Sequence, residues 1–568
     1  MEYFIMFGAL FVFYLFVVVQ GKINDRKLKK YFVKRLQKEF GTFNDAEYSF
    51  ERMMAAPGMF EWHKEDAFYV DDITWNDIDG ERLYKNINRC YSSAGDEYLY
   101  YRMRTPLLKE DTEQFRKNEE IFKYMQEHET ERIQFQLMFA SLGRTGKFSL
   151  YRYLEYLCEL PVKKAITFIW PWIVMVLSVI LLFVNMYAGL AVLFFMIIYQ
   201  NTTYMKKKKE IEPYLVSFQY ILRMLDTAEE VAKSVSDVWK EEREELKVLR
   251  KELKEITGMN LWFISSDFSS NAATDIVSGI LMFIKMLTHV DLFLFYRMLG
   301  QVSNHTEEVD RINCILGKME TDITISSLRN ALPFYAIPTF DQEGMKIEEA
   351  IHPLIDDAVS NSFEIDKGML LTGSNASGKS TFLKTVAICA LFAQTLQTVP
   401  AKVYEAQRYR IYSSMSLRDD LENHESYYMV EIRSIKRILE AVSVDGNKVL
   451  CFVDEVLRGT NTVERIAAAS EIMRSFSGEN MLCFAATHDI ELTYLLEDVY
   501  VNYHFEEEIK NNDILFQYKL LKGPANTRNA IKLLSLMGYP DDLIENAEWM
   551  AGCFLAEGEW RNKEKKFS

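Results

Sequence analysis

A glycine-rich segment in the second half of the chain has residue types and spacing that bind phosphate groups. An apolar strand pattern at 368–372 leads into the sequence GSNASGKST, and an apolar helical pattern follows at 382–396. A strand, a glycine loop and a helix in this order gather backbone N–H groups at a helix N-terminus, which suits phosphate oxygens. The segment predicts a nucleotide-phosphate site formed by Gly373, Ser374, Asn375, Ala376, Ser377, Gly378, Lys379, Ser380 and Thr381.

Two side chains of this loop and an acidic pair after it complete the prediction. In such a site Lys379 neutralises the β- and γ-phosphates of ATP, and Ser380 ligates Mg²⁺. A second buried-strand pattern, 449–453, ends in Asp454 and Glu455. Asp454 would hold the magnesium ion, and Glu455 would orient or deprotonate the attacking water.

A third strand pattern, 481–485, leads into His488. This histidine would sense the γ-phosphate or position the water, although a lone histidine often has a purely structural role. Ligands of open α/β sheets bind at the carboxyl ends of the strands, and all three motifs lie at such ends. We therefore predict a C-terminal α/β P-loop NTPase domain with catalytic Lys379, Glu455 and His488.

The combined motifs resemble those of the MutS family. Residues 372–375 (TGSN) are similar to the family's TGPN loop, and 426–431 (SYYMVE) to its serine-aromatic-glutamate signature. Residues 454–462 (DEVLRGTNT) and 486–492 (ATHDIEL) are similar to its DExGRGTST and ATHxxEL segments. The Ser-Gly-Gly-Gln signature of ABC transporters is not present in the sequence between the glycine loop and the acidic pair.

The resemblance implies an ABC-type ATPase of the MutS kind that uses ATP and Mg²⁺ and works as a dimer. Ser426 of one subunit would then approach the nucleotide bound by the other, acting in trans. The alternative role of Ser426 is that of a helix N-cap, for which serine is well suited. Fainter similarity over about residues 70–150 implies part of the family's helical core domain.

The chain also departs from the family pattern. The mismatch-recognition and connector domains have no counterpart in residues 1–70, and no basic, aromatic-rich stretch stands where the DNA clamp is expected. Ser374, Ser377 and Leu457 occupy positions where the family usually has Pro, Gly and Gly. The aromatic residue that stacks on adenine, expected upstream of Asn375, is not evident in 355–359.

Three apolar runs predict membrane spans. The run 3–19 has no charged residue, and basic residues follow it at 22–35. A pair of runs, 165–184 and 188–204, has lysines on both sides, at 163–164 and 206–209. The positive-inside rule then places the N-terminus outside, the hairpin tip outside and the rest in the cytosol. The alternative for the first run is a buried helix of a soluble protein.

The net charge of the chain indicates which class of partner it could bind. With 66 basic and 82 acidic residues the formal charge is −16, whereas nucleic-acid-binding domains are usually basic. The basic stretches beside the spans fit an anionic membrane surface better than DNA. Two hypotheses stay open: an ATPase coupled to duplex DNA, mismatched or branched as the family implies, and a DNA-independent mechanical ATPase that acts on a membrane partner.

The predicted organisation is an α/β ATPase domain joined to an all-α core and lever region with transmembrane helices, in a multi-pass protein of the cell membrane. The predicted segments are an anchor at 1–20, a basic helical segment at 21–70, a helical core domain at 71–164, a transmembrane hairpin at 165–204, a lever region at 205–330, the ATPase domain at 331–551 and a tail at 552–568.

Overall fold

The computed structural model describes residues 20, 24, 26–159, 166–254, 285–374, 377–415, 427–443, 446–458, 460–510, 513–525 and 530–561. The chain divides into two compact units. The helical unit comprises Met1–Ala67, Tyr84–Arg102 and Thr112–Ala331, and the sheet unit comprises Phe68–Leu83, Met103–Asp111 and Leu332–Ser568. The predicted segment boundaries are not tested by this division and stay predictions.

The helical unit is built around α17 (Thr306–Ala331), which α7, α8 and α12 contact along its length. Charged side chains buried on α17 have partners: Arg102 donates to Asp322 over 3.0 Å, and the backbone N–H of Tyr91 donates to Glu320 over 2.6 Å. Buried charges of this kind are tolerated because they are paired. The other helices are α2 (Phe50–Ala55), α3 (Gly58–His63), α7 (Thr112–Glu127), α8 (Glu129–Leu142), α9 (Leu150–Glu159), α10 (Ile166–Val184), α11 (Met186–Lys233), α12 (Lys240–Glu252) and α16 (Val290–Asn304).

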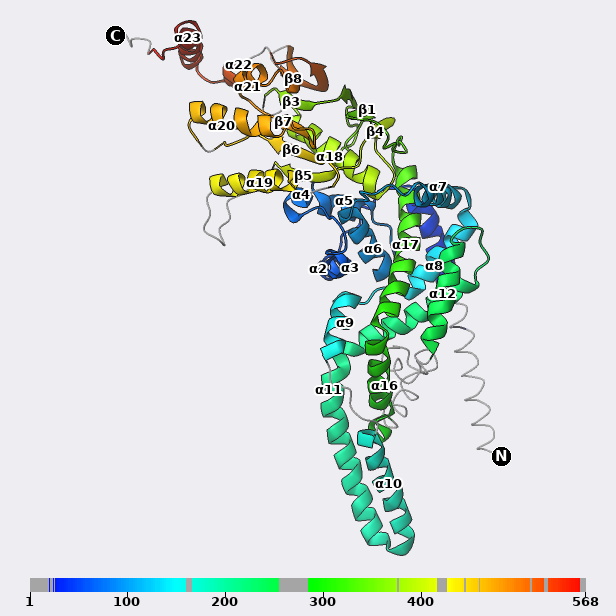
Figure 1. Cartoon of the computed structure of the whole chain (residues 1–568). Coiled ribbons are helices and arrows are strands. Elements are labelled where there is room, and N and C mark those ends of the chain that lie inside the picture. The colour runs from blue at the N-terminus through cyan, green and yellow to red at the C-terminus, as the bar shows by residue number, and fades with distance from the viewer. Residues whose placement is uncertain are drawn as a thin grey trace. The chain divides into compact units, whose positions relative to one another are not determined.

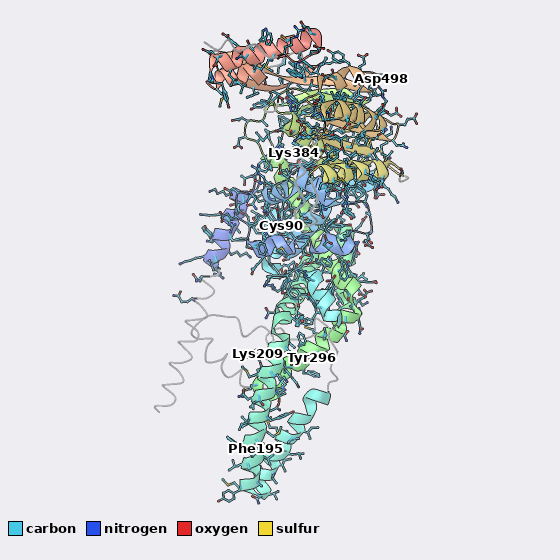
Figure 2. The ribbon with its side chains drawn as sticks, turned by 90° about the vertical axis from the view of Figure 1, so that its left-hand side faces the viewer. Cys90, Phe195, Lys209, Tyr296, Lys384 and Asp498 are labelled. Carbon is cyan, nitrogen blue, oxygen red and sulfur yellow. The ribbon has the colours of Figure 1, made fainter. Side chains whose placement is uncertain are left out.

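Helices α10 and α11 form a hairpin, and they lie side by side in Figure 1. The turn lies at Asn185, whose side chain accepts a hydrogen bond from the backbone N–H of Ala188 and so caps the start of α11. From there α11 continues without a break for 48 residues. Figure 2 labels Phe195 near the hairpin end and Lys209 further along the same helix. The third apolar run, 188–204, and the charged helical segment after it are thus one continuous helix.

Among the described residues one helical stretch, Met186–Ile211, has the length and apolar composition needed to cross a membrane. The segment Ile173–Val184 of α10 is apolar but shorter. The first predicted span, 3–19, lies outside the described residues. The structure alone therefore does not support three spans, and the predicted topology stays a prediction.

The sheet unit contains two sheets. Strands β5, β6, β7, β3, β8 and β9 lie in this order in a six-stranded sheet, parallel throughout except for β9. A smaller antiparallel sheet has the order β2-β1-β4. The strands are β1 (Met345–Ala350), β2 (Asn361–Ile365), β3 (Gly368–Thr372), β4 (Val403–Ala406), β5 (Arg410–Ser414), β6 (Val449–Asp454), β7 (Met481–Ala486), β8 (Tyr500–Lys510) and β9 (Asp513–Lys522).

Helices cover both faces of the parallel part of the sheet, which explains why β3, β6 and β7 are buried along their whole length. On one face Val449, Cys451 and Val453 of β6 pack in a cluster with Ile435 and Met473 from the covering helices. Helix α18 contacts β5, β6, β7 and β1. The helices of this unit are α4 (Asp72–Asp77), α18 (Lys379–Thr395), α19 (Tyr427–Val442), α20 (Thr462–Ser475), α21 (Ile490–Leu495), α22 (Ala530–Leu536) and α23 (Asp541–Glu557), while α5 (Gly80–Ile87) and α6 (Ser93–Arg104) carry residues of both units.

Candidate functional site

The carboxyl ends of three neighbouring parallel strands lie at one edge of the sheet. Leu371 of β3 pairs with Ala486 of β7, and Ala486 also pairs with Asp454 of β6. The residues that follow these three strands therefore lie next to one another at the same edge of the sheet. This register brings together side chains that are far apart in the sequence, as the strand patterns predicted.

The glycine loop connects β3 to α18, and Lys379 is the first residue of that helix. The Lys379 ammonium folds back over the loop and donates to the carbonyl oxygens of Gly373 and Ser374 over 2.8 and 2.7 Å. Gly378 caps the helix with a φ of 101°, a left-handed conformation that a side chain would strain. The lysine thus lies across the N-terminus of α18, where an anion would bind.

Burial and nearby carboxylates shift the pKa of Lys379 in opposite directions. Burial lowers the pKa of Lys379, and the charges of Asp454 and Glu455 raise it again in part, leaving the pKa at about 8. A phosphate group, which carries a stronger negative charge at short range, would hold this ammonium in its charged form.

Ser380 and Asp454 form a pair of hard oxygen ligands. The Ser380 hydroxyl donates to Asp454 Oδ2 over 2.5 Å, so that the two oxygens are adjacent. Mg²⁺ binds through one or two such protein oxygens together with substrate phosphates. The donor set therefore fits a magnesium ion held by Ser380 and Asp454.

Glu455 is fixed by two basic side chains. Its Oε1 lies 2.8 Å from His488 Nε2, and its Oε2 lies 2.7 Å from Arg458 Nε. Burial raises the pKa of Glu455, but the hydrogen bond from His488 and the charges of Arg458 and Lys379 outweigh burial, so that the pKa lies below its ordinary value. The carboxylate is thus ionised at neutral pH, as a group that orients or deprotonates water must be.

Two supporting contacts hold this arrangement. Arg465 of α20 donates to both carboxylate oxygens of Asp489, over 2.6 and 3.0 Å, next to His488 in the sequence. Glu431 of α19 accepts from the backbone N–H of Leu457 over 2.5 Å, in the turn that follows β6. Glu455 and Leu457 both have left-handed backbones in this turn, with φ of 56° and 61°. The left-handed φ of Leu457 gives a physical reason for the family's usual glycine there.

A pocket of about 380 Å³ opens beside the start of α18. Ile355 and Val359 line it, together with the aromatic rings of Phe382, Phe505 and Tyr518. The Tyr518 ring lies so close to Gly378 that a Cβ there would come within 3.0 Å of Cδ1. Burial lowers the pKa of His352, another lining residue, to about 4, and the charge of Lys384 lowers it further, so that this ring is neutral at pH 7. The pocket offers flat apolar surfaces of the size that a nucleobase needs.

The structure thus brings together Lys379, Ser380, Asp454, Glu455 and His488 from three strand ends. Ser374 donates its hydroxyl to Glu507, the Ser377 hydroxyl donates to Ser374 O over 2.8 Å, and Thr381 lines the pocket. Asn375, Ala376 and Ser426 lie outside the described residues.

Sequence reasoning assigned no role to Arg458, although the motif at 454–462 contains it. The pair Arg465 and Asp489 was not predicted either, nor was the aromatic residue Tyr518, which lines the pocket beside the glycine loop. The sequence carried no signal for Tyr518, because a strand far along the chain brings it to the loop.

Comparison with known proteins agrees with this geometry. Residues 369–553 match the family model of MutS domain V. The DNA mismatch repair protein MutS of Thermus thermophilus is 30% identical over 230 residues, which are 40% of this chain and 28% of that protein. The MutS of Clostridium kluyveri is 32% identical over 276 residues, which are 45% of this chain and 31% of that protein. The chain thus matches about 30% of the length of these relatives.

Proposed function

Because its residues 369–553 make this chain a member of the MutS family, we propose that it is a magnesium-dependent ATPase that works as a homodimer. The observation that supports this most is the meeting of Lys379, Ser380, Asp454, Glu455 and His488 at three adjacent strand ends.

Each of these side chains has a defined place in hydrolysis. Lys379 would leave the loop carbonyls and bind the β- and γ-phosphates, while Ser380 and Asp454 would hold the Mg²⁺, which neutralises charge on the phosphates when bound. Glu455 would accept a proton from the attacking water or orient it. His488, 2.8 Å from that carboxylate, would keep it in position and lie close to the γ-phosphate. Ser426 of the second subunit would complete the site in trans.

We place the adenine base in the aromatic pocket, against Tyr518. Replacing Tyr518 by Ala should then raise the Kd for ATP roughly tenfold, since stacking of a base on an aromatic ring contributes about 1–3 kcal/mol. Tyr518→Phe is the matched control, because it keeps the ring and should bind ATP as the wild type does. Equilibrium binding of a fluorescent ATP analogue measures both. Equal ATP affinity of the wild type and the Ala variant would exclude this pocket as the binding site of the adenine base.

Two candidates remain for the cargo, which is the molecule on which ATP hydrolysis would act. The relatives are DNA mismatch repair proteins, which favours duplex DNA, mismatched or branched, as the partner. The continuity of α11 from the apolar stretch Met186–Ile211 to Lys233 favours the second candidate, an ATPase that transmits force to a membrane partner.

Hydrolysis by the detergent-solubilised full chain, with and without long duplex DNA, separates the two. A DNA-coupled ATPase should turn over ATP faster with DNA, and the stimulation should fade as salt is raised, because phosphate contacts release counterions. The same rate with and without DNA at low salt would exclude DNA as the cargo and leave the membrane partner.

We further propose that the hairpin α10–α11 is embedded in the cell membrane with its tip outside, as part of a three-span topology with the N-terminus outside and the ATPase domain in the cytosol. Only 17% of the most apolar part of Met186–Ile211 is buried within the protein, and Phe183, Tyr187 and Phe195 are exposed by 89%, 86% and 70%. Large exposed apolar patches of this kind mark membrane or protein contacts.

Cysteine labelling in intact cells tests this topology. A cysteine placed at Tyr187, near the hairpin tip, should react with a membrane-impermeant maleimide. A cysteine at Val235, which is 96% exposed just after α11, should react only after the cells are permeabilised. Labelling of both positions, or of neither, before permeabilisation would contradict the topology.

A further inference from the structure

A histidine, an aspartate and a cysteine meet in the helical unit, away from the nucleotide site. His63 is the last residue of α3, and Asp310 and Cys314 lie one turn apart on the same face of α17. One ligand atom from each lies within 4.8 Å of the other two. We propose that these three side chains form a zinc-binding site.

The distances between the ligand atoms support a tetrahedral metal. His63 Nε2 lies 3.1 Å from Asp310 Oδ1, Cys314 Sγ lies 3.5 Å from the same oxygen, and Cys314 Sγ lies 3.9 Å from His63 Nε2. Nitrogen, oxygen and sulfur ligands about 2.0–2.3 Å from a tetrahedral zinc ion are separated by about 3.3–3.6 Å. Small side-chain rotations would bring the observed triangle to that spacing.

The neighbours of the triad orient it toward a metal. His63 Nδ1 lies 3.1 Å from Asp66 Oδ2, and a ring that donates its Nδ1 proton to Asp66 would bind the metal through the lone pair of Nε2. A carboxylate behind the histidine is the usual outer-shell arrangement of zinc ligands. The Tyr151 hydroxyl donates to Asp310 Oδ1 over 2.7 Å and fixes that carboxylate in turn.

The types of ligand atom indicate which metal ion this site would bind. Thiolate and imidazole ligands favour Zn²⁺ over Mg²⁺ or Ca²⁺, which prefer oxygen ligands alone. The side chains of His63 and Asp310 are 20% and 17% exposed, so that an ion can enter from solvent and a water can take the fourth position. When the zinc–sulfur bond forms, the thiol proton of Cys314 passes to solvent. The bound ion would join α3 to α17.

Cobalt binding to the full chain in detergent tests the site. After treatment with a chelator, the protein is titrated with Co²⁺ in excess Mg²⁺, which occupies the oxygen ligands of the nucleotide site. One equivalent of Co²⁺ should give the intense visible bands of a tetrahedral ion and a thiolate-to-cobalt charge-transfer band. Stoichiometric Zn²⁺ should abolish both, and it should raise the melting temperature.

Two variants and one control make the result specific. Cys314→Ser should lose the charge-transfer band, whereas Cys553→Ser, at a half-buried cysteine on α23, should keep it. Asp66→Asn replaces an exposed side chain, so the variant should fold as the wild type does. It should weaken zinc affinity by about 10–100-fold. The proposal is overturned if the wild type shows no such band, if Cys314→Ser retains it, or if Asp66→Asn binds zinc as tightly as the wild type. His63 would then serve as an ion-pair partner of the two aspartates without a metal.

Discussion

Replacing Glu455 by Gln should abolish ATP hydrolysis and leave ATP binding intact. The amide keeps the size and the neighbours of the carboxylate, but it cannot accept a proton from water. The lowered pKa of Glu455, which follows because His488, Arg458 and Lys379 together outweigh burial, means that the wild-type group is charged at neutral pH. Loss of a general base typically costs about 10²–10⁴ in kcat, and a coupled phosphate-release assay would measure it.

The control for this variant is Glu471→Gln, at an exposed glutamate of α20. It should turn over ATP at the wild-type rate. A Glu455→Gln variant whose kcat stays within about threefold of the wild type would exclude Glu455 as the group that activates water, since a general base contributes far more than that.

Replacing Lys379 by Met should remove most of the ATP affinity. The ammonium lies across the loop on Gly373 O and Ser374 O, and it would exchange these carbonyls for the phosphates that bind beside them. Hydrogen bonds to charged groups contribute about 1.5–3 kcal/mol, and the Kd should therefore rise by a factor of roughly 10 to more than 100. Lys402→Met, at a half-exposed lysine that pairs with Glu349, is the control and should bind normally.

The same lysine predicts a pH dependence of ATP binding. Its pKa of about 8 means that the ammonium is charged below pH 8 and loses its proton above it. Phosphate binds the charged form, so ATP affinity should be constant up to about pH 7 and should fall as the pH rises through 8, with proton uptake on binding. Isothermal titration calorimetry in buffers of different ionisation enthalpy would detect this uptake. Wild-type affinity that rises above pH 8, or Lys379→Met affinity equal to the wild type, would contradict the role of Lys379.

The meeting of the side chains of the candidate site could be predicted because each of its parts is local in sequence. The glycine loop, Asp454 with Glu455, and His488 each follow an apolar strand pattern, and the parallel register places such ends together. The resemblance to the MutS family, drawn from these motifs, is confirmed by the match to domain V over 369–553. The α/β architecture and the mostly helical first half are confirmed as well.

Contacts that depend on tertiary packing could not be predicted. Tyr518 reaches the glycine loop through the β8–β9 pair, and no spacing rule connects it to Gly378. His63 and Cys314 are separated by most of the helical unit and meet because α3 packs near α17. The sequence pattern also divided 188–204 from the segment after it, whereas α11 passes through that boundary, around which residues 190–212 contain no Gly or Pro.

The central claim is that this chain hydrolyses ATP at the site formed by Lys379, Ser380, Asp454, Glu455 and His488. The most direct test is phosphate release from ATP by the purified, detergent-solubilised full chain, measured with Mg²⁺ and again with excess EDTA. We predict steady turnover with Mg²⁺, none with EDTA, and turnover with Mg²⁺ that is slower by about 100-fold or more in the Glu455→Gln variant. If the wild type neither binds nor hydrolyses ATP in the presence of Mg²⁺, the claim is wrong.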